Sequence, residues 1–165
     1  MEYIVYYDSP VGKLTLVSDG ESLTELRFEK PETLAGTKAD RRTEKRLPVL
    51  SEAVRWLDAY FSGRDPGFIP ELNPQGTEFQ KAVWDILLTI PYGQTKSYGE
   101  IAAETARKTG KRSMSAQAVG GAVGRNPIAL VIPCHRVIGS DGSLVGYGGG
   151  LDRKLRLLRL EKAIL

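Results

Sequence analysis

Residues that build disulfides and metal sites are scarce in this sequence: its 165 residues include one cysteine and one histidine. One cysteine excludes an intrachain disulfide, and the two residues together are too few for a structural zinc site, which takes about four such ligands. We therefore expect no metal and no other cofactor. No apolar run approaches the roughly 20 residues that span a bilayer, and the N-terminus lacks the basic start and cleavage site of a secretory signal. These absences predict a cytoplasmic protein with no membrane partner.

The excess of basic residues is small, with a formal net charge of +3 and a pI near 9.0. Such a charge permits a basic face for nucleic acid, but a slightly basic surface with no partner explains it equally well. Charge alone leaves the partner open.

The two rare residues are neighbours, Cys134 and His135. A free thiol has a pKa near 8.5, and a neighbouring base raises the small thiolate fraction present at neutral pH. A cysteine after an apolar run is also a common inert core residue. The setting Pro133-Cys-His-Arg136 favours a reactive thiol, because the only imidazole stands beside the only thiol. Adjacent side chains in extended backbone point opposite ways, so we expect the two to communicate through a bridging water.

The first part of the chain is predicted to form a small antiparallel sheet and one helix. Residues 3–7, 13–18 and 23–28 are rich in strand-forming residues and are separated by turn residues. Residues 29–46 are polar and charged, as in a solvated loop. Apolar residues then recur at three- and four-residue steps from Leu50 to Phe61, which predicts a helix.

A stretch rich in proline and glycine, residues 62–76, is predicted to be a linker. We therefore expect an N-terminal α/β domain at 1–70 and a C-terminal domain at 71–165. The predicted fold class is α+β, with a small antiparallel sheet and helix followed by a mostly helical domain.

Three helices are predicted at the start of the second domain. Thr77 is the expected N-cap of the first, which ends at Pro91-Tyr-Gly93, and Ser97-Tyr-Gly-Glu100 has the capping-box pattern of the second. A basic turn leads into the third, at residues 115–123. Two short helices joined by a glycine-containing turn indicate a helix-turn-helix.

The end of the chain is predicted to add a hairpin and a helix. Residues 136–138 and 144–147 flank a turn-forming sequence and predict a β-hairpin, the wing of a winged helix-turn-helix. A basic amphipathic helix over residues 151–162 follows. It carries Glu161, which we select as the carboxylate that orients His135; a surface ion pair is the alternative.

The run Asn126-Pro-Ile-Ala-Leu-Val-Ile-Pro-Cys134-His-Arg-Val-Ile-Gly139 strongly resembles the active-site motif of the O6-alkylguanine-DNA alkyltransferases. The similarity covers residues 77–161 closely and the first 70 residues loosely. Further motifs carry it: Ser9-Pro-Val-Gly12, Phe79-Gln-Lys-Ala-Val-Trp84, Ile90-Pro-Tyr-Gly93, Ser97-Tyr98, Ala118-Val-Gly-Gly121, Gly146-Tyr-Gly-Gly149 and Leu157-Leu-Arg-Leu-Glu161.

The resemblance implies a ribonuclease H-like N-terminal domain and a reaction. Such proteins bind double-stranded DNA in the minor groove, flip the alkylated guanine out of the stack, and move its O6-alkyl group to the cysteine, here Cys134. The product is an unactivated thioether and no second thiol exists to resolve it, so each molecule acts once. We expect O4-alkylthymine to be a second substrate, the protein to be a monomer, and a prokaryotic source to place it on the nucleoid.

The resemblance also assigns site residues. Catalytic roles go to Cys134, His135, Glu161 and Tyr98, whose hydroxyl would donate to a ring nitrogen of the base. Substrate binding goes to Asn126, Val137, Tyr147, Gly148 and Gly149. Contacts with DNA go to Ser115, Ala116, Gln117, Ala118, Gly120 and Arg125. Without the resemblance, the tyrosines read as core residues, and the small residues suit helix packing as well as a groove.

Gln117 departs from the family pattern, which generally has an arginine at this position to fill the space of the flipped base. Glutamine can hydrogen-bond the orphaned partner base but brings no charge. We expect the flipping step to suffer more than the transfer chemistry.

Two other functions are open. A DNA-binding regulator would use the same helix-turn-helix with Cys134 as a structural or oxidation-sensing residue. A cysteine hydrolase would use Cys134 and His135, although adjacent residues suit a hydrolytic dyad poorly.

Overall fold

The computed structural model describes residues 2–29, 43–44, 47–147 and 149–164. The chain divides into two compact units, Met1–Pro74 with Pro127–Ala129, and Gln75–Asn126 with Leu130–Leu165. None of the helices in the described part of the chain combines the length and the apolar character needed to span a membrane.

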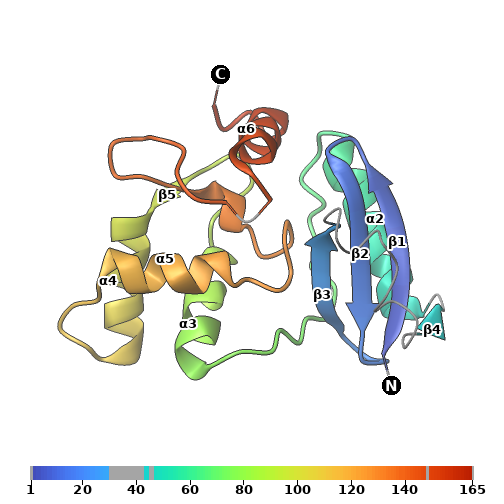
Figure 1. The fold of residues 1–165 in the computed structure, drawn as a ribbon, viewed down its shortest axis with the longest axis horizontal. Helices are drawn as coiled ribbons and strands as arrows, with labels where there is room; N and C mark the ends of the chain where they lie inside the picture. Colours follow the sequence, from blue (N-terminus) through green and yellow to red (C-terminus); the bar gives the residue numbers. More distant parts are fainter. Residues whose placement is uncertain (1, 30–42, 45–46, 148, 165) are drawn as a thin grey trace. The chain divides into compact units, whose positions relative to one another are not determined.

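The first unit is a four-stranded sheet (Figure 1). Strands β1 (Tyr3–Ser9), β2 (Gly12–Ser18) and β3 (Leu23–Phe28) are antiparallel neighbours, as predicted. The two-residue β4 (Thr43–Glu44) pairs with β1 in parallel, so the loop prediction is wrong there, because these residues complete the edge of β1. The rest of that predicted loop, apart from Glu29, lies outside the described residues.

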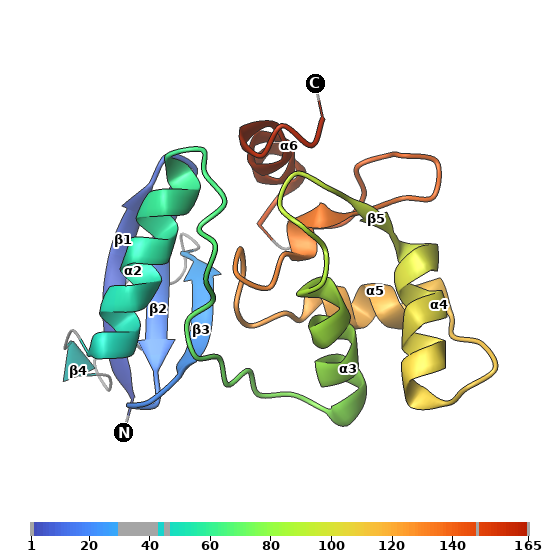
Figure 2. The same ribbon diagram turned by 180° about the vertical axis from the view of Figure 1, so that it is seen from behind.

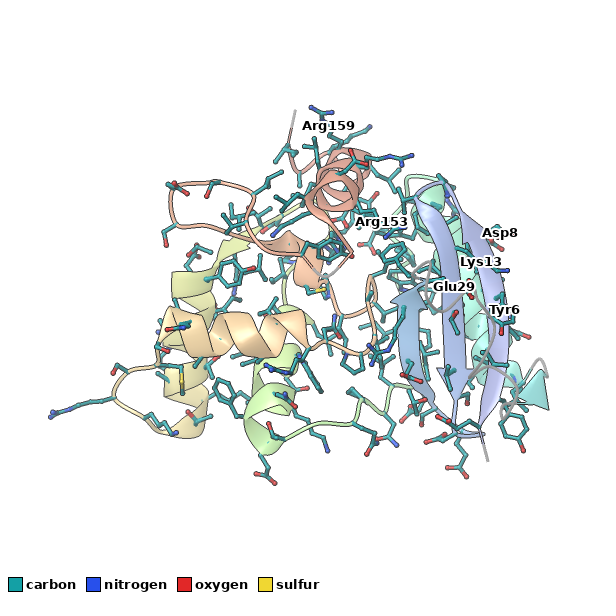
Figure 3. All side chains as sticks on the ribbon, viewed as in Figure 1. Tyr6, Asp8, Lys13, Glu29, Arg153 and Arg159 are labelled. Atoms are coloured by element: carbon teal, nitrogen blue, oxygen red, sulfur yellow. The ribbon has the colours of Figure 1, made fainter. Side chains whose placement is uncertain are left out.

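Helix α2 (Pro48–Phe61) covers one face of the sheet (Figure 2). Its proline stands in the first turn, where no hydrogen bond is lost, and Leu50, Ala53 and Leu57 are buried. The Tyr7 hydroxyl donates to Asp58 at 2.7 Å and so joins β1 to the helix. The face turned away from α2 carries polar side chains, among them Tyr6, Asp8, Lys13 and Glu29 (Figure 3), together with the buried pair Ile4 and Val17.

Three helices form the core of the second unit: α3 (Glu78–Leu87), α4 (Tyr98–Thr109) and α5 (Ala116–Gly124). Their N-caps are Thr77, Ser97 and Ser115, each of which accepts a backbone hydrogen bond. The caps at Thr77 and Ser97 are those that the sequence predicts. Gly110 ends α4 in the left-handed region, with φ of 73°. Helices α4 and α5 are the two helices of the predicted helix-turn-helix.

The predicted hairpin is wrong. Residues Cys134–Arg136 form a short 3-10 helix, η2, and β6 (Val137–Ile138) pairs in parallel with β5 (Lys96–Ser97). Residues 144–147 form no strand. The hydrogen bonds of β6 go to the extended segment before α4, while the turn closes on itself through Gly139 N–H and Ser143 O at 2.9 Å. Helix α6 (Leu151–Leu160) follows this loop.

Candidate active site

A tight turn presents Cys134 at the edge of the core. The Cys134 N–H donates to the Ile132 carbonyl at 2.8 Å across Pro133, whose φ and ψ are −82° and 66°. These values are those of an inverse γ-turn. Leu130 precedes it with φ of 70° although its side chain is fully buried. A non-glycine residue held in this region stores about 1–3 kcal/mol of strain, as is common at functional sites.

Asn126, directly after α5, joins the helix-turn-helix to the cysteine segment. Its Nδ2 donates to the Ile132 carbonyl at 2.8 Å, and its side chain also hydrogen-bonds Cys134. Through these contacts Asn126 holds the end of the helix-turn-helix against the segment that carries Cys134.

The Cys134 side chain is buried, with 8% of its surface exposed. Burial raises the pKa of the thiol, while the Asn126 hydrogen bond and the Lys154 charge act in the opposite direction. The thiol therefore rests in its protonated form, and a base is needed to activate it.

His135 and Glu161 form a buried pair. The imidazole Nε2 lies 2.5 Å from Glu161 Oε2, and both side chains are fully buried. Two further donors hold the other carboxylate oxygen: Arg136 Nε at 2.7 Å and the Gly93 N–H at 3.1 Å. Arg136 also donates to the Ile90 carbonyl at 2.8 Å.

The charges of this cluster follow from its contacts. Burial opposes ionisation of Glu161, but the hydrogen bonds and charges of His135 and Arg136 outweigh it and lower the pKa of Glu161 to about 2. Burial lowers the pKa of His135, against the opposing pull of Glu161. At neutral pH Arg136 therefore balances the carboxylate and His135 is neutral. Because Glu161 accepts the Nε2 proton, the Nδ1 lone pair is the basic one.

Two tyrosines approach the same site. The Tyr98 hydroxyl donates to the Val145 and Gly146 carbonyls, each at 3.3 Å. The Tyr147 ring meets His135 edge-on, with 6.5 Å between centroids, and its buried hydroxyl has no hydrogen-bond partner among the described residues. Burial raises the pKa of both phenols. Both are therefore neutral hydroxyls that can donate a proton or a hydrogen bond.

The other residues predicted to bind the substrate differ in their burial and hydrogen bonds. Val137 is fully buried and directs its carbonyl to Lys154. Gly149 accepts from Arg153 at 3.0 Å. Gly148 lies outside the described residues.

The predicted DNA-contacting residues lie along α5. Ala116, Gln117, Ala118 and Arg125 are exposed, while Ser115 caps the helix. A methyl group added at Gly120 would make only ordinary contact with Tyr98, at 3.9 Å. Packing within the unit therefore does not require a glycine at this position. This favours the interpretation that Gly120 allows close contact with an external partner.

Comparison with known families covers most of the chain. Residues 3–71 match the ribonuclease-like domain of 6-O-methylguanine DNA methyltransferase, and residues 78–163 match its DNA-binding domain. The chain belongs to this methyltransferase family. The resemblance seen around Cys134 is thereby confirmed, and it extends to the N-terminal sheet.

Individual members of the family are similar over nearly their whole length. The methylated-DNA–protein-cysteine methyltransferase of Mycobacterium leprae is 50% identical over 94% of this chain and 89% of its own. That of Methanosarcina barkeri is 47% identical over 96% and 98%. A crystal structure of Mycobacterium tuberculosis OGT in complex with DNA is similar with a TM-score of 0.80 and 48% identity, covering 98% of this chain and 92% of that one.

Three residues of this methyltransferase-family site were missed by the sequence prediction: Gly93, Arg136 as the partner of Glu161, and Lys154. Gly93 has φ of +81°, a conformation that favours glycine. An added Cβ would lie 3.2 Å from the backbone carbonyl oxygen of Glu161. Lys154 could have been found from spacing, because it shares the buried stripe of Leu157, Leu158 and Glu161 at helical intervals.

Proposed function

We propose that this chain is a methylated-DNA–protein-cysteine methyltransferase, which moves the alkyl group from O6 of guanine in DNA to Cys134 and acts once. The single observation that carries the proposal is the adjacent His135, neutral and held through Nε2 by Glu161 at 2.5 Å. A carboxylate-oriented imidazole beside a protonated thiol is the arrangement needed to form a thiolate on demand.

The transfer is a displacement at the alkyl carbon. His135 takes the Cys134 proton through a bridging water, and the sulfur electron pair forms the S–C bond as the C–O6 bond breaks. The electrons of the broken bond go to guanine, which takes a proton from the Tyr98 hydroxyl. The proton on His135 replaces the one that Tyr98 gave, so the thiol proton ends on the base and both residues end neutral.

The base binds between the tyrosines and the loop that follows β6. Tyr98 donates to a ring nitrogen, and Tyr147, with a buried hydroxyl, lines the pocket. Val137 also lines the pocket, and Gly148 and Gly149 are the glycines expected to let the backbone approach the base closely. We extend this pocket to O4-alkylthymine, which presents a similar alkylated oxygen.

Helix α5 is the DNA-contacting element of the proposal. Its exposed small residues fit a minor groove. The damaged base is flipped from the duplex into the pocket of the 71–165 domain. In this proposal the 1–70 domain is a separate fold unit. Ser115, Ala116, Gln117, Ala118, Gly120 and Arg125 form the contact. We propose a monomer that works where the DNA is, in the cytoplasm or on the nucleoid.

Intact-protein mass spectrometry tests the proposal. After incubation with a duplex that carries O6-methylguanine, we expect a gain of one methyl in place of hydrogen, about 14 Da, and no gain in Cys134→Ala. A regulator would bind the duplex with no mass change, and a hydrolase would turn over with none. Either result would overturn the proposal.

A further inference from the structure

Lys154, on α6, is a fully buried lysine. Its ammonium group donates to three backbone carbonyls: Val137 O at 2.5 Å, Val145 O at 2.9 Å and Gly146 O at 3.3 Å. A lysine is almost never fully buried without such partners, and an ammonium has three protons to place. The three contacts therefore account for its whole donor capacity.

The three oxygens belong to two different segments. Val137 begins β6, directly after the turn that carries Cys134 and His135. Val145 and Gly146 lie in the loop that precedes α6. Lys154 thus joins the segment of the thiol to the loop on which Tyr147 lies.

Tyr98 shares two of these three oxygens. Its hydroxyl lies 3.3 Å from both Val145 O and Gly146 O, and a hydroxyl has one proton to donate. In the proposed function that proton goes to the base, so Tyr98 releases the loop when the base binds. Lys154 remains to hold the same carbonyls.

We propose that Lys154 is a positioning residue, which keeps the loop of residues 144–147 in place while Tyr98 changes its partner from the loop to the base, and which leaves its positive charge beside Cys134. The proposal rests on the proposed function for the step at Tyr98. Its electrostatic part concerns the thiol alone and stands without DNA.

Lys154 differs from Arg136 in that its described hydrogen bonds go to carbonyl oxygens and not to a carboxylate. Tyr98, Tyr147 and Lys154 interact electrostatically with Cys134. His135 and Arg136 follow it in the chain and pair with Glu161, and Arg153 interacts with Tyr147. Arg136 is balanced by Glu161 at 2.7 Å, and His135 is neutral. The described hydrogen bonds of Lys154 go to uncharged carbonyls. Burial lowers the pKa of Lys154 to about 8, so the ammonium is still charged at neutral pH, where it favours the Cys134 thiolate.

Lys154→Met tests both parts, because methionine keeps much of the stem and removes the charge and the donors. Alkylation by iodoacetamide reports Cys134 alone, since the chain has one cysteine. We expect the alkylation rate at pH 7 to fall, because Lys154 is charged at this pH and its charge favours the thiolate. With duplex DNA containing O6-methylguanine, we expect the limiting single-turnover rate to fall about tenfold or more. The half-saturating DNA concentration should change by less than the rate.

Arg156→Met is the matched control, because it removes one positive charge from the exposed side of the same helix. Neither the alkylation rate at pH 7 nor the limiting single-turnover rate should change by more than about twofold. If Lys154→Met keeps the wild-type alkylation rate at pH 7 and the wild-type limiting rate, the proposal is wrong. If Lys154→Met lowers the alkylation rate at pH 7 but the wild-type protein takes up no methyl group, the proposed function fails and the electrostatic role of Lys154 stands.

Tyr98→Phe supplies a measurement that does not depend on whether Lys154→Met folds. We expect amide hydrogen exchange in residues 144–147 to stay within about threefold of wild type, because Lys154 still holds the loop. Exchange accelerated by about tenfold or more would show that Tyr98, and not Lys154, fixes the loop, and would overturn the proposal.

Discussion

At the scale of single residues, Glu161 is the centre of the buried polar cluster. Its carboxylate accepts from His135, Arg136 and the Gly93 N–H. Removing its charge leaves Arg136 buried without its counter-ion and His135 without its orienting partner. One substitution therefore affects both stability and chemistry.

We predict that Glu161→Gln destabilises the protein by about 3–5 kcal/mol, as expected when one partner of a buried ion pair is removed. Urea denaturation measures this. Asp85→Asn is the control, because the Asp85–Lys108 pair at 3.2 Å is exposed and such pairs contribute at most about 1 kcal/mol. Equal effects of the two substitutions would contradict the assigned role of Glu161.

The loss of stability at acid pH depends on the same carboxylate of Glu161. Folding lowers the pKa of Glu161 from 4.5 to about 2, so its contribution is complete above pH 4.5 and is lost as the pH falls towards 2. Glu161→Gln should lack this part of the acid destabilisation. Denaturation midpoints measured between these pH values test it, and parallel curves for both proteins would refute it.

Single residues also show how far sequence reasoning reaches. Cys134 and His135 could be identified from their rarity and adjacency, and Glu161 from the need for an orienting carboxylate. The spacing of Lys154 with Leu157, Leu158 and Glu161 indicates a buried position, but its three acceptors are backbone carbonyls, which no sequence pattern reveals. Arg136 was considered only as a neighbour of the thiol, since its ion pair with Glu161 spans 25 positions.

At the scale of elements, the helices were predictable because their signals are local. The N-caps Thr77, Ser97 and Ser115 and the stop at Gly110 all lie within a few residues of the turns they control. The pairing of β5 with β6 involves two residues on each side and joins distant segments. The local turn sequence after Ile138 therefore suggested a hairpin that does not form.

The end of α6 contains a residue in an unfavourable conformation. Lys162 has φ of 59°, and Lys162 N and Ala163 N donate to Arg159 O and Leu158 O, at 3.0 and 2.9 Å. This is a Schellman motif with lysine where glycine is usual. We predict that Lys162→Gly stabilises the protein by about 1 kcal/mol, measured by thermal denaturation.

Arg159→Gly is the matched control inside α6, where glycine should cost about 1 kcal/mol. Loss of stability in both variants would show that the strain at Lys162 is not relieved by glycine.

Helix α5 carries the departure at Gln117, which is exposed. We predict that Gln117→Arg raises the rate of repair on duplex DNA, because arginine adds a charge and a planar group to fill the space left by the flipped base. Repair of the same lesion in a single-stranded oligonucleotide should change less, since no base pair is opened there. An unchanged or slower rate on the duplex would contradict the role given to this position.

At the scale of the whole molecule, the fold class and the order of sheet, helix and helical domain followed from composition and periodicity. The sequence places a linker at residues 62–76, and the compact units divide after Pro74. It gave no sign that Pro127–Ala129 belongs with the sheet, where Leu26 N donates to Pro127 O at 2.9 Å and Ala129 N donates to Leu26 O at the same distance. Such a return of the chain depends on contacts between distant residues.

The central claim is that one chain accepts one alkyl group on its single cysteine. Titration of a fixed amount of protein with excess duplex carrying labelled O6-methylguanine measures this directly. We predict a plateau at one methyl group per chain, located on Cys134, with no further uptake when fresh damaged duplex is added. Repaired guanine in molar excess over protein, or a plateau that survives Cys134→Ala, would contradict it.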